Sequence, residues 1–169
     1  ALGEAENTWP SIVDDLKNGT LKKLYRSHES GLQHFKCDRS IFNGKRYLPV
    51  HLIETSRGCR FNCNFCSVRS FYGSEVYHRP TADVAAEIER LKAKFVFFAD
   101  DNIAAHPEEA RQLFRAIKPL RIRWVSQASL TSAADEKFLD EMVQSGCAAA
   151  IIGLESINPL TLQQMNKGW

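Results

Sequence analysis

The sequence predicts an α/β fold, namely a partial (β/α) barrel of about four βα units with parallel strands, preceded by an irregular, partly helical linker. The main observation is a repeat: from Leu48 onward, a short β-rich run, a turn and an amphipathic stretch recur roughly every thirty residues. A second observation is the run FVFFAD, which is apolar almost throughout, as a strand covered on both faces is. Strands that alternate with helices form parallel sheets with right-handed crossovers.

The first two predicted units contain a cysteine-rich loop. The first strand is expected over 47–55, and the helix that follows has the sequence TADVAAEIERLKAK, with Thr81 as its N-cap. The apolar face of this helix comprises Val84, Ile88 and Leu91. The second strand is expected over 95–100, and Pro107 opens its helix. The inward face of that helix comprises Ala110, Leu113, Phe114 and Ile117.

Two more units complete the repeat. The third strand is expected over about 122–129, with a helix that Gly146 ends. The fourth is expected over 148–155, and Asn158-Pro159 begins another helix. Four units are fewer than the eight that close a β/α barrel, so the sequence is expected to be the first part of a longer barrel.

Residues 1–46 have a different character and are expected to be a linker or the tail of another domain. One short helix is predicted there, with Pro10 near its start and Gly19 after its end. Its inward residues are expected to be Ile12, Val13 and Leu16. A polar, irregular segment rich in His, Ser and Lys follows. The barrel part is expected to cover 47–169.

Composition excludes several classes of protein. The 169 residues are 44% hydrophobic and carry a formal charge of +2, without the runs of Lys and Arg typical of nucleic-acid binding. No apolar run is long enough to span a membrane, and no secretion leader is evident. The five cysteines are odd in number and crowded, which argues against a disulfide framework. We therefore expect a cytoplasmic protein.

The most informative motif is Cys59, Cys63 and Cys66, in a C-x3-C-x2-C pattern. One possibility is a zinc-binding structural or interaction module, in which His51 or His78 supplies the fourth ligand. Another is an iron–sulfur cluster, because three thiolates on four irons leave one iron free to bind a reactant. Electron-transfer clusters use four thiolates, and Cys37 and Cys147 are more typical of ordinary buried side chains.

The neighbours of the cysteines favour the cluster. Arg57, Arg60 and Arg69 would offset the negative charge of thiolates, although arginines are also common on surfaces. Gly58 gives the backbone room beside a bulky group. Phe65 either forms a flat apolar wall for an aromatic ligand or packs into the core.

Further candidate residues follow the other strands, at the sheet edge where β/α barrels hold their chemistry. Each also has a structural explanation: a strand-ending turn for the aspartates, backbone hydrogen bonds for Gln127 and Ser129, packing for Gly153, and the start of a helix for Glu155. The candidates are Asp100, Asp101, Gln127, Ser129, Gly153 and Glu155.

The motif RGCRFNCNFC, at the end of a first strand, resembles the signature of radical S-adenosylmethionine (radical SAM) enzymes. FFADDN, FLDEMVQSGCAAAIIGLES and TLQQMNKGW are similar in order and spacing to the core of the subgroup that carries an upstream cobalamin-binding domain. GEAENTWPSIVDDLKNG resembles the tail of that upstream domain.

The resemblance implies a reaction and its cofactors. Cys59, Cys63 and Cys66 would hold a [4Fe-4S] cluster whose open iron binds SAM. An electron from an external donor would cleave SAM to methionine and a 5′-deoxyadenosyl radical. The cobalamin subgroup methylates or remodels unactivated carbons of small molecules. Because cofactors carry the hard chemistry, the protein's share is positioning and electrostatics.

The resemblance also implies roles for single residues. The backbone of Phe65 would approach the adenine, and Asp100 and Asp101 would face the methionine ammonium with charge-assisted hydrogen bonds. The residues expected to contact the rest of SAM or the substrate are Gln127, Ser129, Gly153 and Glu155. The Asp-x-His-x-x-Gly loop of a cobalamin-binding domain is absent from this sequence. Cobalamin is therefore expected in the upstream domain of the full-length protein, and this part alone is expected to be inactive.

Overall fold

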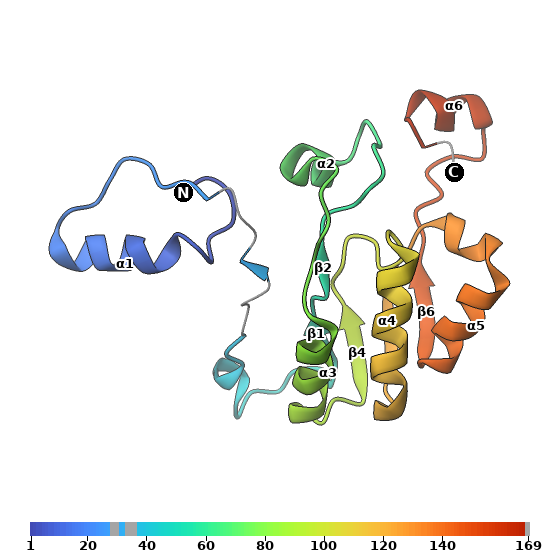
Figure 1. Cartoon of the computed structure of the whole chain (residues 1–169), viewed down its shortest axis with the longest axis horizontal. Helices are drawn as coiled ribbons and strands as arrows, with labels where there is room; N and C mark the ends of the chain where they lie inside the picture. The colour runs from blue at the N-terminus through green and yellow to red at the C-terminus, as the bar shows by residue number, and fades with distance from the viewer. Residues whose placement is uncertain (28–30, 33–36, 168–169) are drawn as a thin grey trace. The chain divides into compact units, whose positions relative to one another are not determined.

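The computed structural model describes residues 1–27, 31–32 and 37–167, and it divides the chain into two compact units, Ala1–Asn43 and Gly44–Trp169 (Figure 1). Part of the polar segment expected in the linker, residues 28–30 and 33–36, lies outside the described residues. No described helix is long and apolar enough to cross a membrane.

The first unit contains the predicted helix α1 (Trp9–Asn18) and a 3₁₀ helix, η2 (Ser40–Phe42). Pro10 opens α1 and Gly19 ends it with a left-handed backbone, as predicted. The expectation that Leu16 points inward is wrong, since its side chain is 61% exposed. Ile12 and Val13 are partly buried, and no residue of α1 is fully buried.

The second unit is built on a four-stranded parallel sheet, which confirms the predicted fold class. The strands are β1 (His51–Ile53), β4 (Phe95–Phe98), β5 (Arg123–Gln127) and β6 (Cys147–Ile151), in the order β1-β4-β5-β6. Neighbours pair in parallel, so that the row Leu52, Phe97, Val125 and Ala149 crosses the sheet in register. Each strand is shorter than predicted, because pairing covers only part of each β-rich run.

Helices follow the strands as the repeat predicts (Figure 1). They are α3 (Thr81–Arg90), α4 (Pro107–Ile117), α5 (Glu136–Gln144) and the short α6 (Pro159–Gln164). The predicted apolar faces of α3 and α4 are buried, except that Leu91 is only partly buried. The predicted N-cap at Thr81 is wrong: Thr81 is the first helical residue and Pro80 precedes it, without a side-chain cap.

Several short elements carry no periodic signal and were not predicted. The strands β2 (Ser56–Arg57) and β3 (Tyr77–His78) form a two-stranded antiparallel sheet. Between them lie the cysteines and the helix α2 (Ser67–Tyr72). The 3₁₀ helices η3 (Lys118–Leu120) and η4 (Leu130–Ala134) flank β5. Elements of two to six residues are too short for hydrophobic periodicity to reveal.

The core lies between the sheet and its helices, with Trp124 at its centre. Trp124 is 0% exposed and stacks on Phe114 of α4 at 5.4 Å between ring centroids. Phe98 of β4 lies edge-on to it at 5.5 Å. The indole N–H donates to the carbonyl and hydroxyl oxygens of Ser145, so the one polar atom of the ring is satisfied.

Trp124→Ala should lower the free energy of unfolding by about 3–5 kcal/mol, because it opens a cavity among rings that cannot close it. Val143 of α5 is 68% exposed, so Val143→Ala should change the free energy of unfolding by less than about 0.5 kcal/mol. Chemical denaturation followed by circular dichroism measures both. Equal effects would place the centre of the core elsewhere.

Candidate functional site

The cysteine loop begins beyond the carboxyl end of β1, and the other predicted site residues lie at or after the carboxyl ends of β4, β5 and β6 in the sequence (Figure 1). This loop, residues 58–66, leaves β2 and enters α2. Cys66 directly precedes α2, and its backbone N–H donates to the carbonyl of Cys63 at 3.1 Å, which closes a tight turn. None of the three cysteines is in a disulfide; Cys63 is 9% exposed, and Cys59 and Cys66 are half-buried.

Gly58 begins the loop with a backbone that other residues rarely adopt. Its φ is +95°, and a Cβ placed there would lie 2.2 Å from the carbonyl oxygen of Glu75. Its N–H donates to Asp101 Oδ2 at 2.8 Å. The sequence explained this glycine by the size of a ligand, whereas the structure shows that the approach of the Glu75 backbone already requires it.

Asp100 fixes the chain between β1 and the cysteine loop. Its side chain is 0% exposed, and it accepts hydrogen bonds from Thr55 N at 2.7 Å, Thr55 Oγ1 at 2.6 Å and Ser56 N at 2.6 Å. Burial raises the pKa of Asp100 to about 6, and the hydrogen bonds from Thr55 and Ser56 oppose that rise only in part. Asp100 is therefore a positioning residue in this structure, and its contact with the methionine ammonium stays a prediction.

Asn102 connects the cysteine loop to β5. Its Nδ2 lies 3.8 Å from Cys59 Sγ, and its Oδ1 accepts from the backbone N–H groups of Ala104 and Ser129. Asn102 was not among the predicted site residues. Its position directly after the two aspartates was the one available signal, because a run of polar residues at a strand end commonly lines a site.

The turn at the end of α6 contacts the cysteine loop from the other side. Asn64 donates from its backbone N to Met165 O at 3.0 Å and from its side-chain Nδ2 to Gln164 O at 2.9 Å. Asn166 Nδ2 donates in return to Asn62 O at 2.6 Å. These partners are 100 residues or more apart in the sequence, and no local pattern predicts them.

Lys167 joins the same loop to the end of β6. This buried lysine donates to Gly153 O at 2.8 Å and pairs with Glu155 Oε1 at 2.9 Å. Its Nζ also lies 5.7 Å from the ring centroid of Phe65, within cation–π range. The structure thus brings three predicted site residues, Phe65, Gly153 and Glu155, around a lysine that the sequence analysis did not single out.

The remaining predicted residues lie at the end of β5. Gln127 is exposed as the last residue of the strand. Ser129 is 1% exposed, and its hydroxyl forms a hydrogen bond with Thr131 at 2.8 Å. Of the three arginines, Arg57 forms a bidentate pair with Glu54, so part of its charge is already balanced.

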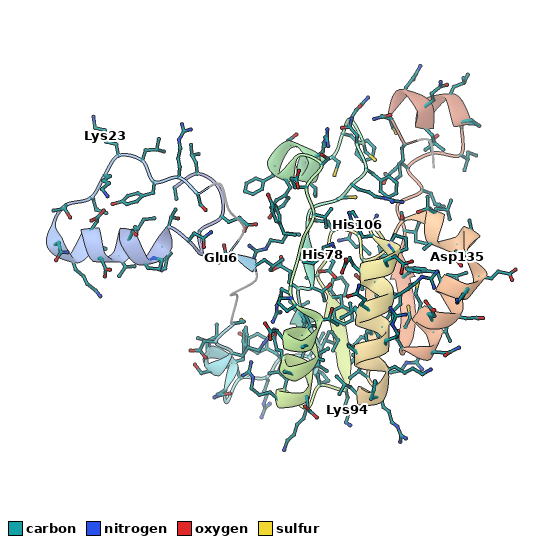
Figure 2. All side chains as sticks on the ribbon, in the orientation of Figure 1. Glu6, Lys23, His78, Lys94, His106 and Asp135 are labelled. Atoms are coloured by element: carbon teal, nitrogen blue, oxygen red, sulfur yellow. The ribbon has the colours of Figure 1, made fainter. Side chains whose placement is uncertain are left out.

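Among the described residues, no group of three or more His, Cys, Asp or Glu side chains is close enough to hold a single metal ion. His78 instead lies beside His106, with ring centroids 5.6 Å apart (Figure 2). This arrangement does not supply the closed set of ligands that structural zinc needs. In a four-iron cluster each thiolate binds a different iron, so the three sulfur atoms need not converge on one metal ion.

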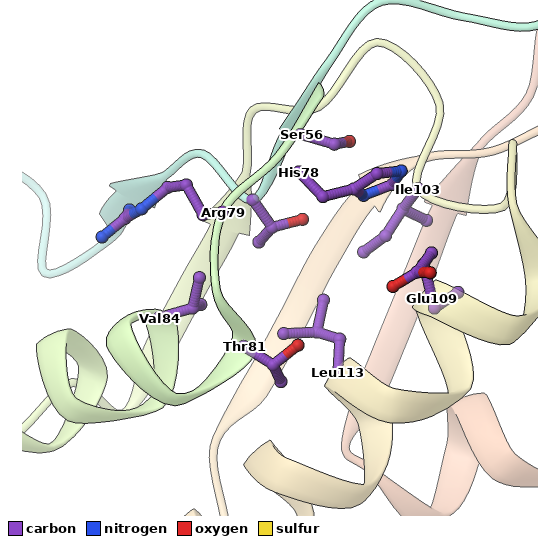
Figure 3. A pocket seen from close by; sticks show the side chains of 10 residues that line it. Ser56, His78, Arg79, Thr81, Val84, Ile103, Glu109 and Leu113 are labelled. Atoms are coloured by element: carbon purple, nitrogen blue, oxygen red, sulfur yellow. The ribbon is translucent and has the colours of Figure 1, made fainter. Parts of the chain in front are cut away.

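A small cavity lies beneath β2 and β3, lined by Ser56, His78, Thr81 and Glu109 among others (Figure 3). Its volume is about 20 Å³, enough for one water molecule and far too little for SAM. Burial lowers the pKa of His78, and the negative charge of Glu109 opposes this shift. This cavity therefore cannot hold SAM.

The family model of the radical SAM superfamily matches residues 53–169. The chain belongs to the radical SAM superfamily. This agrees with the resemblance of the cysteine motif and with a parallel sheet whose carboxyl ends carry the polar residues. The zinc-module alternative is not favoured.

Two relatives are methyltransferases. The chain is 30% identical to bacteriochlorophyllide d C-12(1)-methyltransferase of Chlorobaculum tepidum over 180 residues, which covers 98% of the chain and 39% of that protein. It is 34% identical to cytidylyl-2-hydroxyethylphosphonate methyltransferase of Streptomyces wedmorensis over 123 residues, which covers 70% of the chain and 23% of that protein. The chain therefore spans well under half the length of these relatives.

A solved structure has a similar fold. The radical SAM methyltransferase TsrM of Kitasatospora setae, solved with its tryptophan substrate and a SAM analogue, superposes with a TM-score of 0.61 at 25% identity. The match covers 67% of this chain and 23% of TsrM. Another structure of TsrM contains cobalamin and a [4Fe-4S] cluster.

Gly58→Ala should lower the free energy of unfolding by about 2–4 kcal/mol. The new Cβ must displace the Glu75 backbone, and the alanine must adopt a positive φ. Gly44 is a matched control: its φ is +74°, but a Cβ would meet nothing within 4 Å, so Gly44→Ala should cost only about 1 kcal/mol. Chemical denaturation compares the two. Equal losses would mean that the Glu75 contact is unimportant.

Asp100 should make stability depend on pH. Its pKa is about 6 in the folded protein and 3.8 ordinarily, so the folded state binds more protons between these values. The stabilising contribution is complete below pH about 4 and falls by up to about 3 kcal/mol as the pH rises through about 6. In Asp100→Asn this part of the pH dependence should disappear. Denaturation of the iron-free proteins from pH 4 to 7 measures it; identical slopes in both proteins would contradict the assignment.

Proposed function

We propose that this chain is the part of a radical SAM methyltransferase that binds a [4Fe-4S] cluster through Cys59, Cys63 and Cys66. The observation that carries the proposal is the loop bearing three cysteines in C-x3-C-x2-C spacing, outside any disulfide, at the carboxyl ends of parallel strands in a chain of this superfamily. With one electron from an external donor, the bound cluster would cleave SAM to methionine and a 5′-deoxyadenosyl radical. The whole protein would use this chemistry to methylate, or otherwise remodel, an unactivated carbon of a small molecule.

The protein's own residues prepare the loop for this chemistry. Asp101 is tied to the Gly58 N–H at the start of the loop, and Asn102 Nδ2 approaches Cys59 Sγ. N–H donors near thiolates stabilise their negative charge. Asp101 is half-buried whereas Asp100 is fully buried, so we propose that Asp101 makes the main contact with the methionine ammonium and that the predicted contact of Asp100 is the secondary one.

SAM would lie between the cysteine loop and the ends of β5 and β6. Phe65 is 53% exposed on the loop, and Gln127 is exposed at the end of β5. Gly153 and Glu155 lie at the end of β6 beside Lys167. A Cβ at Gly153 would lie 2.3 Å from Glu155 Oε1, so a side chain at residue 153 would disturb this edge of the site. Ser129 is buried, so we propose that it positions the segment after β5 rather than contacting SAM directly.

Cobalamin belongs to the whole protein in this proposal. The Chlorobaculum relative matches 98% of the chain, which includes residues of the first unit, and one TsrM structure contains cobalamin. We assign residues 1–46 to the tail of an upstream cobalamin-binding domain. The named relatives act on chemically different molecules, so the substrate is assigned only as a small molecule.

The test is anaerobic reconstitution of the whole protein with iron and sulfide, followed by electron paramagnetic resonance of the reduced protein with and without SAM. A four-iron signal that changes when SAM is added supports the proposal, because it requires an open iron. Stoichiometric zinc that survives chelation, with no cluster, would contradict it.

Single alanine variants of Cys59, Cys63 and Cys66 should each lose most of the iron, sulfide and SAM-dependent signal, since the cluster then lacks one of three protein ligands. Cys37→Ala and Cys147→Ala are matched controls and should retain the iron, the sulfide and the SAM-dependent signal. Iron analysis and the same spectra measure the difference. Normal cluster content in any of the three variants would remove that cysteine from the ligand set.

A further inference from the structure

We infer that the turn Gln164–Lys167 is a clamp that positions the cysteine loop, with the side-chain amides of Asn64 and Asn166 as its positioning groups. The inference rests on the proposed function, because it concerns the cluster that the loop would hold. The inference gives the turn after α6 a role at the cysteine loop, although this turn lies in the fourth βα unit and the cysteines lie in the first.

The contacts are reciprocal, which distinguishes the clamp from a chance approach of two loops. Asn64 donates two hydrogen bonds to the turn, to Met165 O and Gln164 O, and Asn166 donates one hydrogen bond back to Asn62 O. All three acceptors are backbone carbonyls. The pairing therefore depends on the two asparagine side chains and on the paths of the two backbones.

The backbone of the turn is shaped for this contact. Asn166 has a φ of +53°, a left-handed conformation that asparagine adopts more readily than most residues. Its N–H donates to Gln163 O, and the next N–H, of Lys167, donates to Leu162 O at 2.8 Å. These bonds end α6 and leave the Asn166 side chain aimed at the cysteine loop.

The clamp spans the sheet. β1 and β6 are the two edge strands of the sheet (Figure 1). The cysteine loop, which comes after β1 and β2, is nevertheless hydrogen-bonded to the turn after α6, the helix that follows β6. Lys167 extends the link to Gly153 O and Glu155, which are predicted to face SAM. Release of the clamp would therefore have two effects: it would loosen the cysteine loop, and it would separate this loop from Gly153 and Glu155 after β6.

The experiment compares Asn64→Ala, Asn166→Gly and Gln163→Ala in the whole protein. Glycine at residue 166 keeps the left-handed backbone and removes only the side chain. Gln163 is exposed on the same helix, and Gln163→Ala is the matched control. Asn64 and Asn166 are also exposed, so global unfolding should change little in all three variants.

Two measurements separate the clamp from the proposed function. In the iron-free protein, hydrogen exchange at the Asn64 amide, which donates to Met165 O, should become about tenfold faster in Asn166→Gly and stay unchanged in Gln163→Ala. In the reconstituted protein, chelators should remove iron about tenfold faster from both asparagine variants. Asn64→Gln, which keeps an amide donor, should recover much of the loss in Asn64→Ala, and SAM should change the spectrum of the reduced cluster less in the alanine variant than in Asn64→Gln.

Unchanged exchange at Asn64 in Asn166→Gly would overturn the clamp, whether or not a cluster binds. Faster exchange with normal iron retention would mean that the contact exists but does not position the loop, which also overturns the inference. A protein that binds no cluster but shows the faster exchange would contradict the proposed function and leave the contact itself supported.

Discussion

A buried carboxylate determines how the chain enters the site. Asp100 ends the second predicted strand and accepts three hydrogen bonds from Thr55 and Ser56, the residues between β1 and the cysteine loop. Two of these donors are backbone N–H groups, which would be costly to bury without a partner. The path of the chain into the loop is therefore held by a side chain that follows the neighbouring strand, and Ser56, which pairs with His78 in β2, is one of the residues held.

The two residues after Asp100 extend the same arrangement. Asp101 binds the N–H of Gly58, and Asn102 reaches both Cys59 and the backbone of Ser129. Three consecutive residues thus hold the start of the cysteine loop, its first thiol and the segment after β5. A parallel sheet makes this possible, since it brings the carboxyl ends of all its strands to one edge. The candidate site residues therefore follow the strands at one edge of the sheet.

In this chain, residues of several βα units contact the cysteine loop. The cysteines occupy eight residues of the first unit. Their support comes from the residues after β4 on one side and from the turn after α6 on the other. A loop backbone without hydrogen-bond partners is mobile. Because this loop has no hydrophobic core of its own, these hydrogen bonds hold its shape.

The sequence by itself determined the fold class, the four strands and their helices, the cysteine ligand candidates and the family, because periodicity and the C-x3-C-x2-C spacing are local properties of the chain. Only the tertiary structure decided that Asp100 is a buried support, that Gly58 answers to the Glu75 backbone, and that Asn64, Asn166 and Lys167 belong beside the cysteines. It also showed that Leu16 is exposed and that Pro80, rather than Thr81, precedes α3. The roles of Asp100, Gly58, Asn64, Asn166 and Lys167 depend on contacts between residues that are distant in the sequence, and no local pattern encodes such contacts.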